Sequence, residues 1–126
     1  VNLYAALADI AGVEARFSAP EQITAAADSD ALSRRAVEVL CEQLGSVAGD
    51  LALTFGAWDG VYVTGGLAPL LTRWIERGGF RRRFEDKGRL SPAVARVPTS
   101  IVQHADPGLL GAAAWAMMAA GTPGRG

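Results

Sequence analysis

Two adjacent glycines between two elements are the feature of this sequence best suited to bind a ligand. The string Thr64-Gly65-Gly66-Leu67-Ala68-Pro69 follows a short β-branched and aromatic run and precedes a helix-forming segment. Glycine tolerates positive φ and lets a ligand approach the backbone closely. The helix that follows offers free N–H groups and the positive end of its dipole, which attract phosphate. The spacing therefore predicts a nucleotide or phosphate site, although a tight turn that only requires glycine explains the same pair.

The sequence holds only weak evidence for other nucleotide-binding, metal-binding or catalytic motifs. No Gly-x-Gly-x-x-Gly or Gly-Lys-Ser/Thr string occurs, so neither the dinucleotide-binding nor the P-loop class is supported. One cysteine, Cys41, and one histidine, His104, leave no internal disulfide and no His/Cys metal cluster. His104 and Asp106 resemble a general base and its orienting acid, but no Ser or Cys nucleophile motif accompanies them. A polar strand end at His104 and a helix N-cap at Asp106 are the favoured interpretations.

The basic residues are concentrated in one segment. Seven of the twelve Lys and Arg residues lie between Arg73 and Arg89, where Glu76, Glu85 and Asp86 are interleaved with them. A patch for phosphate or nucleic acid is one interpretation. We favour a solvated helical face with Phe80 and Phe84 buried four residues apart, because no stacking aromatics surround the cluster.

The amino-acid composition indicates which broad class of protein the chain belongs to. The 126 residues are 50% hydrophobic and 20% charged, which is typical of one globular domain. The net charge of −1 argues against a nucleic-acid partner, since phosphate-binding proteins usually carry a large basic excess. The longest uncharged stretch, 107–124, has an apolar part shorter than a membrane span needs. We therefore expect a cytoplasmic protein that does not enter the membrane.

Hydrophobic periodicity and turn residues predict an α/β protein that is rich in helix. We expect helices over 2–11, 19–27, 31–55, 67–77, 80–84, 91–96 and 108–120, and strands over 60–64 and 99–103. Ser18 with Glu21, and Ser91 with Pro92, resemble helix caps. Residues 122–126 form a loose tail. Two strands are too few for an independent sheet, so we expect a partial domain.

The long helix carries an apolar series at spacings of three and four: Leu40, Leu44, Val47, Leu51 and Phe55. This series needs a partner surface. Gly45 and Gly49 either weaken the helix or let another backbone come close. Cys41 lies beside the series and is expected to be a buried, inert thiol. Trp58, Trp74 and Trp115 are expected to be core or interface anchors.

Several strings resemble the C-terminal part of bacterial glucokinases, whose fold is the hexokinase or actin-like ATPase fold, a ribonuclease H-like architecture. The similar strings, in order, are Val1-Asn2-Leu3-Tyr4, 60–69, Gly79-Phe80-Arg81, 84–89, and His104 with 107–112. The Phe-Glu-Asp-Lys-Gly and Pro-Gly-Leu-Leu-Gly strings are specific to this family. The Gly65-Gly66 pair belongs to the wider fold, where it is the adenosine motif.

The resemblance implies that the parent protein phosphorylates glucose at its 6-hydroxyl with ATP and Mg²⁺. It places Gly65 and Gly66 against the adenosine, with Leu67, Ala68 and Leu70 in one wall near the purine. The whole chain, 1–126, would be a partial, nucleotide-side domain, cut from a longer polypeptide and without a signal peptide. A fragment of another sugar kinase, a kinase-like regulator, or a non-catalytic module that uses the Arg73–Arg89 face are the alternatives.

The family's catalytic aspartate, phosphate loops and sugar-binding residues precede the Val-Asn-Leu-Tyr string, and none of them has a counterpart in this sequence. Phosphoryl transfer depends on such positioned groups. We therefore expect the isolated chain to be inactive. We also expect it to self-associate as a homo-oligomer through apolar surface and open strand edges.

Overall fold

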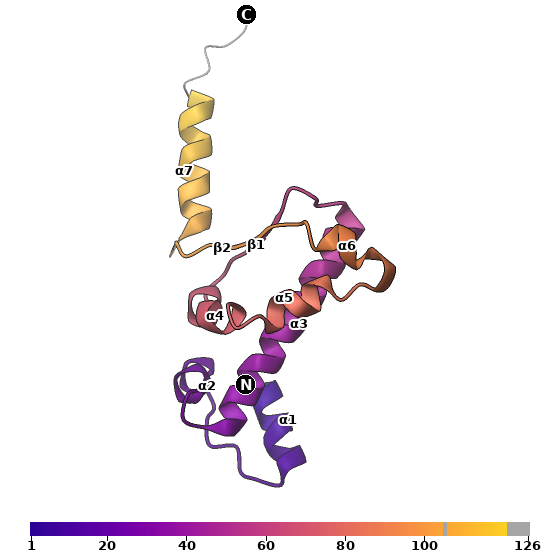
Figure 1. The fold of residues 1–126 in the computed structure, drawn as a ribbon. Coiled ribbons are helices and arrows are strands. Elements are labelled where there is room, and N and C mark those ends of the chain that lie inside the picture. The colour runs from indigo at the N-terminus through magenta and orange to yellow at the C-terminus, as the bar shows by residue number, and fades with distance from the viewer. Residues whose placement is uncertain (105, 121–126) are drawn as a thin grey trace, which may run out of the picture.

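The computed structural model describes residues 1–104 and 106–120, which form a helix-rich α/β unit (Figure 1). In chain order the elements are α1 (Asn2–Ala11), α2 (Pro20–Ala26), α3 (Ala31–Phe55), β1 (Val61–Val63), α4 (Ala68–Ile75), α5 (Gly79–Glu85), the 3₁₀ turn η1 (Gly88–Leu90), α6 (Ser91–Val94), β2 (Thr99–Ile101) and α7 (Pro107–Ala120). The predicted element order is confirmed. The predicted tail at 122–126 lies outside the described residues.

The two strands pair in parallel and bring two loops to one edge. Val61 lies opposite Thr99, and Val63 opposite Ile101. The N–H of Val61 donates to the carbonyl of Pro98 at 2.9 Å, just before β2 begins. Because the carboxyl ends of parallel strands meet at one edge, the glycine pair after β1 and the connection to α7 leave the sheet on the same side.

The centre of the molecule is the packing of α5 along α3 (Figure 1). Phe80 and Phe84 of α5 are buried completely, with ring centroids 6.0 Å apart. A Cβ on Gly45 would lie 2.1 Å from the carbonyl oxygen of Phe80, and one on Gly49 would lie 2.3 Å from that of Phe84. The two glycines of α3 therefore let the α5 backbone come close, as one of the two sequence interpretations proposed.

The buried face of α3 is made of small residues, whereas most of the predicted apolar series is exposed. The buried positions include Ala36, Val37, Cys41, Gly45, Ala48, Gly49 and Ala52. In the predicted series only Leu44 packs partly against the core, while Leu40, Val47, Leu51 and Phe55 are exposed. At Gly45 and Gly49 the α5 backbone approaches too closely for a leucine side chain.

The predicted C-terminal end of α1 is confirmed, whereas the predicted N-caps of α2 and α6 are wrong. Gly12, at φ 66°, ends α1 in the left-handed conformation, as predicted. The predicted Ser18 and Glu21 cap of α2 is wrong, because the side-chain oxygen of Gln22 accepts from the N–H groups of Ser18 and Ala19. The predicted Ser91 cap is also wrong, since Ser91 lies inside α6 and its hydroxyl accepts from the N–H of Lys87.

Asp30 caps α3, and its removal gives a pH-dependent prediction. Its carboxylate accepts from the Ser33 N–H at 2.7 Å, and the Ser33 side chain and N–H lower the pKa of Asp30 below 3.8. Asp30→Ala should cost about 1 kcal/mol of unfolding free energy. Because the folded-state pKa is depressed, this stabilisation is present above the ordinary pKa and is lost as pH falls through the folded-state value. Denaturant titrations at several pH values measure it.

Two outcomes would contradict this account of the cap. One is a cost for Asp30→Ala that stays constant down to strongly acidic pH. The other is an equal cost for Glu14→Ala, which changes an exposed acid in a loop.

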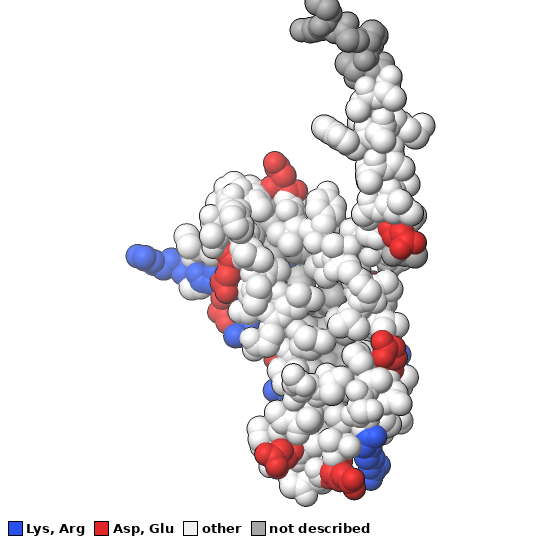
Figure 2. All heavy atoms as spheres, turned by 180° about the vertical axis from the view of Figure 1, so that it is seen from behind, with Lys and Arg blue, Asp and Glu red and all other residues white. Residues whose placement is uncertain are grey.

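Helix α7 stands apart from the other elements (Figures 1 and 2). It carries no charged residue, and Leu109, Trp115 and Met117 are each more than 70% exposed. No helix of the described residues has the length and apolarity to cross a bilayer.

We predict that the chain self-associates through this helix and the exposed leucines of α3, because large apolar patches are rare on monomers. Light scattering should show a mass that rises with concentration. A monodisperse monomer that binds no hydrophobic dye would contradict the prediction.

Candidate functional site

The glycine pair forms a tight corner between β1 and α4. Gly65 has φ +114°, a conformation that side-chain-bearing residues rarely adopt, and its carbonyl accepts from the N–H of Ala68 at 3.0 Å. Gly66 does not have positive φ. Of the two glycines, Gly65 therefore needs the conformational freedom that the sequence suggested for the pair, and Gly66 does not.

The corner is open on its outer side. A Cβ built on Gly65 or on Gly66 would meet no atom within 4 Å. Within the described ranges, 1–104 and 106–120, the N–H groups of Gly66, Leu67 and Leu70 make no hydrogen bond. Free amides at the first turn of a helix, next to a backbone without side chains, suit a polar ligand that lies against the chain.

Leu67, Ala68 and Leu70, the residues expected to line the purine site, differ in how far their side chains are exposed. Leu67 and Leu70 are 41% and 42% exposed and present apolar side chains beside the corner. Ala68 is 4% exposed, so its methyl group belongs to the core and its backbone alone faces the turn. Leu67 and Leu70 lie three residues apart, a spacing that puts them on neighbouring parts of the helix surface.

Two grooves flank the first turn of α4, and α2 contributes to both. One groove, of about 190 Å³, is lined by Leu67, just before α4, and Leu71 of α4, with Ile23 and Thr24 of α2 and parts of α1 and α3. The other, of about 400 Å³, lies between Pro69 and Leu70 of α4 and Thr24 of α2. No motif in the sequence indicated that α2 takes part, because its residues come into place only through tertiary packing.

The basic segment is neutralised by acids and forms no free cationic patch. Six of its seven cations lie within 4 Å of a carboxylate, in the pairs Arg73–Asp28, Arg77–Asp28, Arg81–Glu85, Arg82–Glu42, Arg83–Asp86 and Lys87–Asp50. Figure 2 likewise shows no continuous basic surface on the face it views. Since Phe80 and Phe84 are buried beneath, the solvated helical face is confirmed.

The remaining candidates have structural roles. The N–H of Asp106 donates to Nδ1 of His104 at 3.1 Å, and the carbonyl of Asp106 accepts from Leu110 in the first turn of α7. Burial raises the pKa of Cys41 to about 11, so its thiol stays protonated and inert at neutral pH, as expected. Among the three tryptophans, Trp74 is a core residue, whereas Trp58 and Trp115 are mostly exposed. The described residues contain no cluster of acids, His and Cys that could hold a metal.

Comparison with known proteins assigns the family. The family model described as Glucokinase matches residues 1–119. The chain belongs to the glucokinase family. A glucokinase from Xylella fastidiosa (strain M23) is 49% identical over 117 residues, which cover 92% of this chain and 35% of that protein. One from Xanthomonas oryzae pv. oryzae (strain MAFF 311018) is 48% identical over 98% of this chain and 37% of that protein.

The fold agrees with this assignment. The crystal structure of a glucokinase from an Antarctic psychrotroph matches 90% of this chain with a TM-score of 0.80 and 34% identity. The match covers 36% of that structure's chain, and the chain spans about 35% of the length of the curated relatives. The resemblance to glucokinases seen in the sequence is therefore confirmed.

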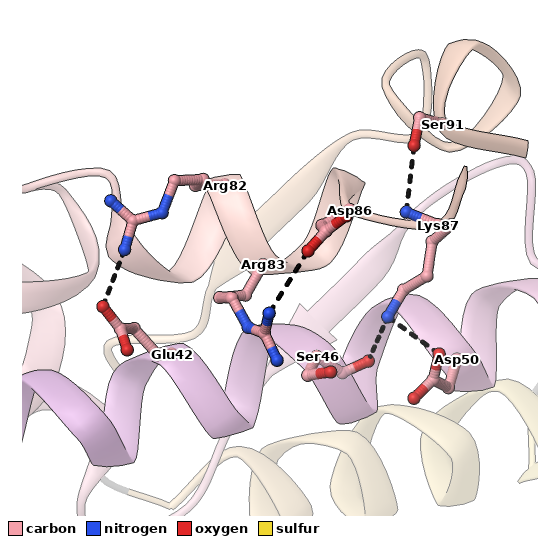
Figure 3. Close-up of polar contacts among 8 residues, drawn as sticks. All are labelled: Glu42, Ser46, Asp50, Arg82, Arg83, Asp86, Lys87 and Ser91. Carbon is pink, nitrogen blue, oxygen red and sulfur yellow. Dashed lines mark hydrogen bonds and ion pairs between the residues drawn. The ribbon is translucent and has the colours of Figure 1, made fainter. Parts of the chain in front are cut away.

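One of the strings that resemble glucokinases, the segment 84–89, has a structural explanation. Lys87 follows α5, and its side chain is only 7% exposed (Figure 3). Its ammonium donates to the carbonyl of Ser46 at 2.9 Å and pairs with Asp50 at 2.7 Å, both on α3. With Phe84 buried beside it, Lys87 fastens the end of α5 to α3. The string thus maintains the packing that supports α4 and the corner.

Proposed function

We propose that this chain is the C-terminal, nucleotide-side part of an ATP-dependent glucokinase. The full-length protein transfers the γ-phosphoryl group of MgATP to the 6-hydroxyl of glucose. The observation that carries the proposal is the family match over residues 1–119, combined with an open glycine corner at the start of α4. The full-length protein adopts the actin-like ATPase fold, is cytoplasmic and forms a homo-oligomer.

The corner would hold the adenosine part of ATP. Gly65 and Gly66 leave room for the ligand against the backbone, and the N–H groups of Gly66, Leu67 and Leu70, which make no hydrogen bond to the described residues, are donors for it. The exposed side chains of Leu67 and Leu70 offer apolar contact to the flat base, and Ala68 supports them from the core. The two grooves beside α4 give the base a concave seat.

The chain's contribution is binding and orientation of the nucleotide. Mg²⁺ would accompany the ATP phosphates as MgATP and supply charge stabilisation at the transferring phosphoryl group. Positioning ATP lowers the barrier because it makes the transfer to glucose effectively intramolecular. The groups that bind the sugar and activate its hydroxyl belong to the remainder of the protein.

A coupled assay of ADP formation tests the proposal. The full-length protein should turn over only when both glucose and MgATP are present. The isolated chain should show no turnover above background, because phosphoryl transfer needs positioned groups that this sequence does not supply. A full-length protein that forms no ADP with glucose, or an isolated chain that does, would contradict the proposed division of roles.

A further inference from the structure

A charged bridge joins the two helices that flank the candidate nucleotide grooves. Asp28 follows the end of α2, and its carboxylate accepts from the guanidinium of Arg73 on α4. The second carboxylate oxygen lies 3.7 Å from Arg77, one helical turn further on. Arg73 lies in α4 and Arg77 just beyond its end, so the single carboxylate of Asp28, just after α2, contacts both cations.

Both ends of the bridge are held in place. On the acid side, Arg34 donates to the backbone carbonyls of Ala27 and Asp28 at 3.1 and 2.6 Å, which fixes the turn that carries Asp28. On the basic side, the guanidiniums of Arg77 and Arg73 lie 3.9 and 5.3 Å from the ring centroid of buried Trp74. Because the partners are already ordered, the pair loses little side-chain entropy when it forms.

The separation of α2 and α4 contributes to the width of both grooves. Thr24 of α2 lines both of them, while Leu67 and Leu71 line one and Leu70 lines the other. Ile23 of α2 and Leu71 of α4 are both buried in the core, so apolar packing joins the inner sides of the two helices. The grooves lie open beside this contact. The bridge of Asp28 with the two arginines is the polar contact that ties the ends of the two helices together.

We infer that Asp28 is a positioning residue for nucleotide binding. By holding α2 at a fixed distance from α4, it keeps the grooves beside Leu67 and Leu70 at the width that the base requires. This inference rests on the proposed function of the corner. Asp28 touches no ligand itself, and its effect passes through the arginines to α4. Its partners are about half exposed, so the expected effect is moderate, about two- to fivefold in affinity.

Steady-state kinetics of Asp28→Asn in the full-length protein test this role. The KM for ATP should rise about two- to fivefold, while kcat and the KM for glucose stay unchanged. The difference from wild type should shrink in about 1 M NaCl, where the Debye length is about 3 Å. Asp28→Glu should restore most of the ATP affinity, because it restores the charge that the arginines bind.

The matched control is Glu42→Gln, which removes a bridge from α3 to Arg82 of α5, away from both grooves (Figure 3). It should leave the KM for ATP unchanged. Equal changes in the KM values for ATP and glucose, or an equal effect of Glu42→Gln, would overturn the positioning role. If Gly66→Val weakens ATP binding and Asp28→Asn does not, the inference fails and the proposed nucleotide corner stands. If neither variant affects ATP, both fail.

Discussion

Gly66→Val in the full-length protein should weaken ATP binding by at least tenfold, about 1.4 kcal/mol, and leave glucose binding unchanged. Gly66 does not have positive φ, and a Cβ there would meet no protein atom within 4 Å. The fold should therefore tolerate valine. The branched side chain would instead fill the space that adenosine is proposed to occupy against the backbone. Calorimetric titration with ATP and with glucose measures both affinities.

Comparison of Gly65→Val with Gly66→Val separates the effect of backbone strain from the effect of crowding the nucleotide. Gly65 has φ +114°, so valine there should cost stability as well, roughly 1–3 kcal/mol, in addition to ATP affinity. A pattern in which Gly66→Val changes ATP and glucose binding equally would indicate general disruption. Unchanged ATP binding in Gly66→Val would mean that the corner does not touch the nucleotide.

Gly45→Ala should destabilise the chain by about 3 kcal/mol or more. The added methyl group would lie 2.1 Å from the carbonyl oxygen of Phe80, and also within 2.9 Å of that residue's carbonyl carbon and Cα. These are backbone atoms of α5 that no rotamer change can move, so the two helices must separate. Thermal or denaturant unfolding followed by circular dichroism measures the loss.

The control for this prediction is Gly111→Ala in α7. It makes the same substitution in a helix where a Cβ would meet no atom within 4 Å. Alanine favours helix over glycine by about 1 kcal/mol, so this variant should be neutral or slightly more helical. Opposite signs for the two variants are the expected result. Equal effects would mean that helix propensity, and not close packing of α3 on α5, decides the outcome.

Much of the local structure could be predicted from the sequence because local rules decide it. Helix α1 has the predicted bounds, Gly12 ends it, and the two strands lie where β-branched runs meet glycine and proline. The burial of Phe80 and Phe84 at a spacing of four residues followed from helical periodicity. These features are indicated by patterns that are local in the sequence, although tertiary contacts complete the strand pairing and the burial of the two phenylalanines.

The face of α3 that is buried could not be predicted, because a remote segment determines it. Leu40, Val47 and Leu51 form the more apolar series, yet the glycine and alanine face is buried since α5 packs there at backbone distance. Hydrophobicity alone ranks the leucines first. Only the position of α5, which begins 24 residues after α3 ends, reverses that order.

The candidate site is only partly local in the sequence. The resemblance to glucokinases indicated the contiguous residues Gly65, Gly66, Leu67, Ala68 and Leu70, and their role in nucleotide binding stays a prediction. Helix α2 takes part in the site only through tertiary packing. The bridge joins Asp28 and Arg73, which lie 45 positions apart, so no local sequence pattern indicates it. The sequence pattern also did not distinguish the two glycines, whereas the turn places positive φ at Gly65 and not at Gly66.

Hydrogen–deuterium exchange of the full-length protein, with and without saturating MgADP, tests the central claim most directly. The N–H groups of Gly66, Leu67 and Leu70 make no hydrogen bond within the described part of the chain, so they should exchange quickly in the free protein. If the corner holds adenosine, peptides that cover 64–72 should become protected when the nucleotide binds. Nucleotide binding that is saturated by calorimetry, with exchange over 64–72 unchanged, would contradict the account.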